Sequence, residues 1–317
     1  MTRTDPLSGK LVTLFGGSGW VGIHVAQDLL KRGARLKIAS RHPEKARDLR
    51  PMANLGQVAM VRCDVTRSES VRAAMTGSDL VVNLVGTFEG DLGAVMADGA
   101  QNIAKAAAEE GVQALVHVSA IGADIEGDTA YAVTKAEGEE AVRDAFPKAT
   151  IMRPSIIFGE DGEFINMMAG LIQRLPVLPV FAPDSELQLV WVDDVAAAIV
   201  AALGDPSKHG GKTYELGGPE RVPMLALNRR IAEQQGRKRH FIPLPDSVSG
   251  GIAAATGWMP GAPITQQQWK LLEKGSTVSG DYPGFDKLGI TPKPLDVFLE
   301  RWMVRYRKHG RFGVKPV

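Results

Sequence analysis

Apolar residues in the first half of the chain come in short runs, separated by segments whose apolar positions have a helical spacing. The runs have the length and β-branched content of strands buried on both faces. They are residues 11–15, 35–40, 58–63, 79–85, 114–119 and 149–154. The helical segments are 19–33, 43–50, 68–75, 97–111 and 129–146. This alternation predicts an α/β fold with a doubly wound parallel sheet and helices on both faces.

The pattern changes after Pro154. Prolines crowd residues 173–186, a helical pattern returns at 193–203, and the later segments are shorter and richer in Gly and Pro. Either Asp193 or Asp194 is expected to be the N-cap of the returning helix. The chain is therefore predicted to form a large domain over residues 1–155, to which 187–216 return, and a smaller C-terminal lobe over 156–317.

Composition narrows the class of protein. The chain is 44% hydrophobic and 23% charged with a formal net charge of +1, so whole-molecule charge gives no reason to expect nucleic-acid binding. The one cysteine, Cys63, lies in an apolar run and is expected in the core, and the six histidines lack ligand spacing, so no metal site is predicted. From the short polar N-terminus we expect no signal or transit peptide, and no run approaches the roughly 18 apolar residues of a spanning helix. Any membrane attachment is predicted to be peripheral.

A glycine-rich turn joins the first predicted strand to the first predicted helix. It contains Gly17-x-Gly19-x-x-Gly22, overlapped by a pattern that starts at Gly16. In this context the early glycines permit a tight turn close to a diphosphate, Gly22 permits close packing of helix on sheet, and the helix N-terminus offers amide protons to the anion. The turn predicts a dinucleotide site; the alternative is a tight turn without a ligand.

The end of the second predicted strand bears on which nucleotide binds. It offers Ser40 and Arg41, while the first acid, Glu44, comes only after Pro43. An acid here binds the ribose hydroxyls of NAD, whereas an arginine accommodates a 2′-phosphate through charge-assisted hydrogen bonds. NADP(H) is therefore favoured, against the alternative that Arg41 is a solvated surface residue. Asp64, after the third strand, either accepts from the adenine amino group or caps the next turn.

Candidate chemistry follows the fourth and fifth strands. Val85 and Gly86 follow the fourth predicted strand, where we expect the backbone of the chain to run close to the nicotinamide-side ribose. Ser119 ends the fifth strand, and Tyr131 and Lys135 are four apart, hence on one face of a helix. The ammonium is expected to lower the pKa of the phenol and to reach a ribose hydroxyl, and Ser119 to orient a carbonyl. The same pair also serves a protein that only binds the nucleotide.

Several motifs together resemble the short-chain dehydrogenase superfamily in its extended or atypical Rossmann form. They are "FGGSGWVG", "SRHPEK", "CDVT", "SAIGAD", "YAVTKAEGEEAVRDAFP" and "RPSIIFGEDGEFIN". More narrowly, the chain is similar to the family of Rossmann-fold accessory subunits of respiratory complex I. That similarity continues through "VWVDDVAAAI", "TYELGGPE", "ITQQQWKLLEKGSTVSG", "LGITPKPL" and "YRKHGRFG", nearly the full length.

This resemblance implies a tightly held NADPH with a structural or regulatory role and no established turnover. It also implies that the partners are other complex I subunits, at the cytoplasmic face of the inner membrane. The expected nucleotide contacts are Gly16, Ser18, Gly19, Trp20, Val21, Gly22, Ser40, Arg41, Asp64, Val65, Val85, Gly86, Ser119, Tyr131, Lys135 and Pro154. Two positions depart from the family pattern: Trp20 replaces the commoner phenylalanine, and His24 stands where an arginine often contacts the diphosphate.

Two other functions remain open from the sequence. One is an active NADP-dependent oxidoreductase or epimerase with Tyr131 as acid or base and Ser119 and Lys135 beside it; the other is a related protein of quinone biosynthesis. Two segments are candidate partner surfaces. Residues 301–317 are basic around Trp302 and Tyr306 and suit an anionic membrane or an acidic protein, or form a solvated tail. Residues 247–264 are apolar and form either a packed element or an exposed loop.

Overall fold

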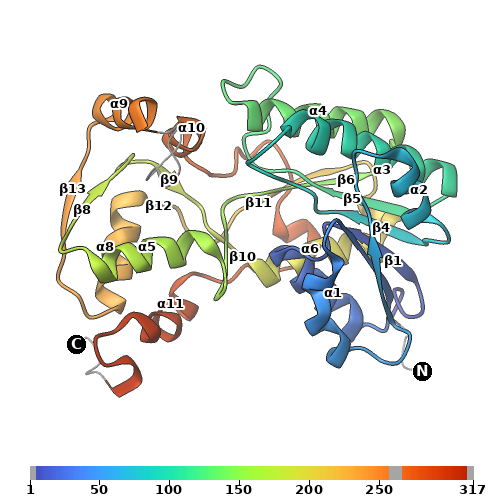
Figure 1. Ribbon diagram of the computed structural model, residues 1–317, viewed down its shortest axis with the longest axis horizontal. Helices are drawn as coiled ribbons and strands as arrows, with labels where there is room; N and C mark the ends of the chain where they lie inside the picture. Colours follow the sequence, from blue (N-terminus) through green and yellow to red (C-terminus); the bar gives the residue numbers. More distant parts are fainter. Residues whose placement is uncertain (1–4, 257–265, 313–317) are drawn as a thin grey trace. The chain divides into compact units, whose positions relative to one another are not determined.

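A computed structural model describes residues 5–256 and 266–312 (Figure 1). The chain divides into two compact units. Unit 1 comprises residues 1–154, 192–216 and 279–291, and unit 2 comprises 155–191, 217–278 and 292–317. The expected boundaries differ from these at three places, since Ser155 and residues 187–191 lie in unit 2 and residues 279–291 lie in unit 1.

Unit 1 is built on a seven-stranded sheet with the order β11-β6-β5-β4-β1-β2-β3, in which every neighbouring pair is parallel. The strands are β1 (Leu11–Phe15), β2 (Arg35–Ser40), β3 (Val58–Arg62), β4 (Leu80–Asn83), β5 (Ala114–Val118), β6 (Thr150–Pro154) and β11 (Thr213–Leu216). The predicted doubly wound parallel sheet is confirmed. β11 adds an edge strand that the apolar pattern did not predict.

Helices cover both faces of this sheet (Figure 1). They are α1 (Trp20–Lys31), α2 (Ser68–Met75), α3 (Gly99–Glu110), α4 (Ala130–Ala145), α6 (Val192–Gly204) and the short α7 (Pro206–His209). The small side chains of α3, including Ala100, Ala104 and Ala107, pack against Phe15, Val81 and other apolar strand residues in one buried cluster. Cys63 is 2% exposed and lies in that cluster, as expected of a core residue.

Three local predictions in unit 1 were wrong in detail. Pro43–Met52 forms a 3-10 segment instead of an α-helix. A π-helical turn, Gly93–Asp98, precedes α3 where the pattern predicted the helix to begin at residue 97. α6 begins at Val192, so Asp193 and Asp194 lie within its first turn and neither is the N-cap.

Unit 2 combines short strand pairs with five α-helices among its described residues. The strand pairs are β7 (Ile157–Phe158) with β10 (Val190–Trp191), β8 (Val177–Val180) with β13 (His240–Pro243), and β9 (Glu186–Leu187) with β12 (Val222–Pro223). The helices are α5 (Glu163–Arg174), α8 (Met224–Gln234), α9 (Asp246–Thr256), α10 (Gln266–Lys274) and α11 (Asp296–Met303). Phe158, Leu227, Leu299 and their neighbours form the core of the unit.

The basic C-terminal segment is not a continuous helix with one cationic face. α11 ends at Met303, and 3-10 turns follow. Trp302 is buried in the unit 2 core, Arg305 pairs with Glu160 at 3.0 Å, and Arg307 is 9% exposed. Lys315 and residues 257–264 lie outside the described residues, so the partner roles of the two segments stay predictions. Within the described part of the chain, no helix is long and apolar enough to cross a membrane.

Candidate nucleotide-binding site

The glycine turn leaves no room for side chains at its close contacts. Gly16 has φ +77°, and a Cβ there would lie 3.1 Å from the carbonyl carbon of Leu84. A Cβ on Gly22 would lie 2.7 Å from the Cα of Gly17. The first turn of α1 therefore packs on the glycine turn itself, and this contact, more than packing on the sheet, is what Gly22 permits. Gly19 is the N-cap of α1 and its amide donates to the Gly16 carbonyl at 2.9 Å, and Val21 lies in the first turn of the helix.

A hydrogen bond joins the glycine turn to the end of β2. The Ser18 hydroxyl donates to Ser40 Oγ at 2.8 Å, and the Gly16 amide donates to the carbonyl oxygen of Ala39 at 2.9 Å. Arg41 follows directly and is exposed. Ser18, Ser40 and Arg41 thus gather at the carboxyl ends of two neighbouring strands, the edge where such sheets bind ligands.

The residues after β3 hold their loop in place. Asp64 Oδ1 accepts from the Thr66 amide at 3.1 Å and from the Thr66 hydroxyl at 2.8 Å, and these hydrogen bonds lower the pKa of Asp64. The capping alternative for Asp64 is thus present, while its adenine contact stays a prediction. The Val65 carbonyl accepts from Asn102 Nδ2 at 2.9 Å, which ties the loop to α3.

The loop after β4 lies against α4. The Val85 amide donates to Asn83 Oδ1 at 3.0 Å, and a Cβ on Gly86 would lie 3.4 Å from Lys135 Nζ. Asn83 also contacts Nδ1 of the buried His117 at 3.0 Å. Desolvation lowers the pKa of His117 to about 3, with a further contribution from Lys135, so His117 is neutral at physiological pH.

Tyr131 and Lys135 lie on one face of α4, but their electrostatics differ from the prediction. The Thr129 side chain caps the helix by accepting from the Ala132 amide at 3.2 Å. Lys135 Nζ donates to the Val118 carbonyl at 3.1 Å and lies 6.0 Å from the centroid of the Tyr131 ring. Burial lowers the pKa of Lys135 to about 8 and raises the pKa of Tyr131 to about 12. The expectation that Lys135 lowers the pKa of the phenol was therefore wrong.

Phe88 covers Tyr131, a contact that the sequence did not suggest. The two rings stack with centroids 4.5 Å apart and planes 14° apart. Phe88 itself is 60% exposed. The loop after β4 thus lies beside both members of the Tyr131 and Lys135 pair: Phe88 stacks on Tyr131, and Gly86 leaves the space next to the Lys135 ammonium open.

Ser119 and Pro154 lie at the same edge of the sheet. Ser119 is 4% exposed, and its amide donates to the Met152 carbonyl at 2.7 Å. The Pro154 carbonyl accepts from the Ile121 amide at 3.0 Å. The carboxyl ends of β5 and β6 are thereby joined through their backbones.

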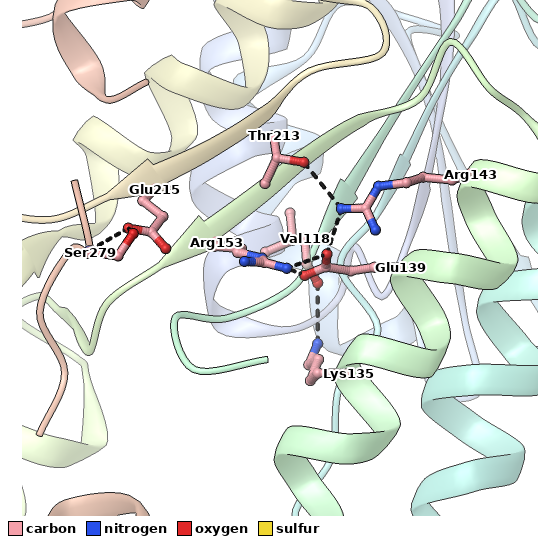
Figure 2. Close-up of polar contacts among 8 residues, drawn as sticks. All are labelled: Val118, Lys135, Glu139, Arg143, Arg153, Thr213, Glu215 and Ser279. Atoms are coloured by element: carbon pink, nitrogen blue, oxygen red, sulfur yellow. Dashed lines mark hydrogen bonds and ion pairs between the residues drawn. The ribbon is translucent and has the colours of Figure 1, made fainter. Parts of the chain in front are cut away.

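A buried ion-pair network supports this edge and was missed by sequence reasoning (Figure 2). Glu139 is fully buried and accepts from Arg153 Nε and Nη2, both at 2.8 Å, and from Arg143 Nη2 at 2.7 Å. Burial alone would raise the pKa of Glu139, but the hydrogen bonds and charges of the two arginines outweigh it, and the pKa is lowered. Arg143 also donates to Thr213 Oγ1 at 3.1 Å, so the network joins α4 to β6 and β11. The signal was available, since Tyr131, Lys135, Glu139 and Arg143 recur every four residues.

A second polar contact brings residues 279–291 into unit 1. Glu215 Oε2 accepts from the Ser279 amide at 2.6 Å and from its hydroxyl at 2.9 Å (Figure 2). The guanidinium of Arg153 lies 4.9 Å from the centroid of the Tyr282 ring. The segment therefore packs beside β6 and β11 despite its distance along the sequence.

Trp20 and His24, the two residues of α1 that depart from the family pattern, both have partners within unit 1. His24 Nδ1 lies 2.5 Å from Asp193 Oδ1, so the imidazole is bound to the first turn of α6. The Trp20 ring packs edge-on against His24 at 6.0 Å. A diphosphate contact from His24 would compete with Asp193, as the departure from the family pattern suggested.

The residues at this edge fit a dinucleotide. The turn is free of side chains where a diphosphate approaches, and the hydroxyls of Ser18 and Ser40 stand beside a cationic Arg41. Lys135 and Tyr131 lie farther along the same edge, at the carboxyl end of β5. Among the described residues, no group of His, Cys, Asp and Glu side chains could hold a metal ion.

Comparison with known proteins agrees with this geometry. The NAD(P)H-binding family model matches residues 16–206. The chain is 31% identical to "NADH dehydrogenase [ubiquinone] 1 alpha subcomplex subunit 9, mitochondrial" of Arabidopsis thaliana, over 97% of this chain and 81% of that protein. The chain belongs to the NAD(P)H-binding family, and within it to the subunit 9 family.

Other proteins similar to this chain have enzymatic names. The chain is 30% identical to the ceramide reductase of Caulobacter vibrioides over 74% of each protein. Among solved structures, the Citrobacter triphenylmethane reductase complexed with NADP(H) superposes with a TM-score of 0.73. It is 21% identical and covers 92% of this chain and 99% of its own, so it shows the shared fold.

Proposed function

We propose that the chain is an NADPH-binding accessory subunit of the proton-pumping NADH:quinone oxidoreductase, respiratory complex I. The observation that carries this is the similarity to subunit 9 proteins over nearly the whole chain. It includes the parts of unit 2 after residue 206, where the NAD(P)H-binding family model ends. The subunit is peripheral, at the cytoplasmic face of the inner membrane, and its partners are other complex I subunits.

The nucleotide lies along the carboxyl edge of the sheet. The turn from Gly16 to Gly22 holds the diphosphate, and Ser40 and Arg41 hold the 2′-phosphate. Asp64 and Val65 flank the adenine. A further set, Val85, Gly86, Ser119, Tyr131, Lys135 and Pro154, flanks the nicotinamide and its ribose. When bound, the nicotinamide can carry hydride, but the subunit does not need that chemistry for its role.

The side chains of Tyr131 and Lys135 support a role in nucleotide binding. The phenol, with its pKa of about 12, stays protonated at physiological pH, and Phe88 stacks on its ring. The Lys135 ammonium is held by the Val118 carbonyl. Both groups are suited to donate hydrogen bonds to ribose hydroxyls. The bound nucleotide then adds its binding free energy to the folded state, so that unit 1 presents a stable surface to neighbouring subunits.

Gentle purification from the native membrane tests the proposal. The co-purifying proteins and the nucleotide released on denaturation would both be identified. We expect a set of complex I subunits together with NADPH at close to one equivalent per chain. A chain recovered alone, from the soluble fraction and with freely exchanging nucleotide, would overturn the assignment.

A second candidate function is an NADP-dependent reductase, which the similarity to ceramide reductase favours. Tyr131 would then donate its proton to the carbonyl oxygen while the nucleotide supplies hydride. Oxidation of NADPH with ketone substrates, lost in Tyr131→Phe, would support this candidate. Unchanged activity in that variant would remove Tyr131 from the reaction.

A further inference from the structure

Helix α5 is apolar on its outer face as well as on its packed face. Ile165, Met168, Ala169 and Ile172 form the packed face in the unit 2 core. On the other side, Met167 is 54% exposed and Leu171 is 45% exposed. No charged residue occurs between Glu163 and Arg174. A surface helix normally carries polar residues opposite its packed face, so this outer face lacks the usual polar cover.

The exposed apolar surface continues beyond the end of α5 into β8. Leu175 is 41% exposed and Val177 is 43% exposed. β8 pairs in parallel with β13 (Figure 1). In the register of the pair, His240 lies opposite Val177. Ile242 of β13 is 51% exposed. We call the exposed residues Met167, Leu171, Leu175, Val177 and Ile242 the α5 patch.

Cations border the α5 patch. The segments 164–183 and 234–245 contain Arg174, Arg237, Lys238 and Arg239 and no acidic residue. Arg239 Nε donates to the Ile172 carbonyl at 2.7 Å, which fixes the basic segment at the last turn of α5. Arg174 and Lys238 are exposed, and neither pairs with an acid among the residues that the structure describes. Their charges are therefore available to an anionic surface.

We propose that the α5 patch and its cations dock the chain on the surface of an anionic phospholipid bilayer. Exposed aliphatic side chains beside unpaired cations match the boundary between acyl chains and negatively charged head groups. The surface differs from the basic C-terminal segment, where Arg305 and Arg307 are engaged within unit 2. The inference deepens the proposed function, which places the chain at a membrane, but the test uses the isolated chain and does not depend on complex I.

The test is co-sedimentation of the purified full chain with vesicles of phosphatidylcholine, with and without phosphatidylglycerol. We expect binding to the anionic vesicles only, weakened by high salt. The double variant Arg174→Ser and Lys238→Ser should weaken binding about 30-fold, since each cation near a membrane contributes about 1 kcal/mol. The double variant Leu171→Ser and Leu175→Ser should weaken binding at least about tenfold.

Matched controls use exposed residues of unit 1. Lys31→Ser with Lys148→Ser removes two exposed cations, and Leu55→Ser with Ile125→Ser removes two exposed apolar side chains. Both controls should bind vesicles like the unaltered chain, and every variant should keep its melting temperature. Equal binding to neutral and anionic vesicles, or no binding, would overturn the proposal. The proposal would also be overturned if the control variants lost vesicle binding and the α5 variants kept it. Binding of the α5 patch to an acidic protein in place of lipid would overturn it as well.

Discussion

Arg41 is the residue on which the choice of nucleotide is expected to depend. Its neighbour Ser40 is held by Ser18, so the guanidinium starts from a fixed backbone at the end of β2. Arg41→Ala should weaken NADPH binding roughly 10- to 100-fold, the range for lost hydrogen bonds to a charged group, and leave NADH binding nearly unchanged. Titration calorimetry with both nucleotides measures this, with the exposed Arg47→Ala as control. An equal loss for NADH would show that Arg41 does not read the 2′-phosphate.

Lys135 should give the nucleotide-free chain a distinctive pH dependence. Its pKa is about 8 when folded, well below the ordinary value of 10.5 that the unfolded chain restores. Between these values the unfolded chain binds the extra proton, so the free energy of unfolding should rise with pH, by up to about 1.4 kcal/mol per unit. Denaturant unfolding from pH 8 to 10 should show this rise, and Lys135→Met should abolish it. Identical slopes for Lys135→Met and for the exposed control Lys148→Met would contradict the prediction.

The residues that gather at the carboxyl edge of the sheet could be predicted, because the ends of the predicted strands give their positions. Ser18, Ser40 and Arg41 come together as the parallel order requires. The raised pKa of Tyr131 could not be predicted, because it comes from burial of the phenol among other elements, where the Phe88 ring stacks on it. Spacing along a helix gives the face that a side chain occupies, and the partners on the facing elements then set its pKa.

At the scale of elements, Glu139 should contribute strongly to the joining of α4 with β6. Glu139→Gln leaves the partly buried Arg153 without its ionic partner, and the free energy of unfolding should fall by roughly 3 kcal/mol. Glu140→Gln, on the exposed side of the same helix, should change it by less than about 0.5 kcal/mol. Chemical denaturation of both variants measures the difference. Similar values for the two would mean that Arg153 finds other partners.

The elements of unit 1 were largely predictable, and those of unit 2 were not. Long apolar runs predicted β1 to β6 because strands buried on both faces are apolar throughout. The π-helical turn Gly93–Asp98 has no such signal, since it depends on close packing, in which a Cβ on Gly138 would lie 2.4 Å from the Met96 carbonyl. In unit 2, strands such as β7 and β10 are two residues long and too short to show any periodicity.

At the scale of the molecule, bound nucleotide should stabilise three stretches that are far apart in sequence. Residues 5–154, 192–216 and 279–291 share unit 1, and Glu215 and Ser279 join the last two. At a nucleotide concentration about 100 times its dissociation constant, unfolding of this unit should cost about 2.7 kcal/mol more. Hydrogen exchange with and without NADPH should therefore show added protection of slow amides in all three stretches.

The segment 279–291 decides that prediction, because no nucleotide contact is expected there. Ser279→Ala removes the hydroxyl that donates to Glu215 and leaves the glycine turn intact, so NADPH should still protect β1 and β2 in that variant while its effect on 279–291 declines. Ser247→Ala, in unit 2, is the control and should leave both responses unchanged. If residues 279–291 exchanged at one rate with and without nucleotide in the unaltered chain, the segment would not unfold together with the sheet. The contacts of Glu215 would then hold it only locally.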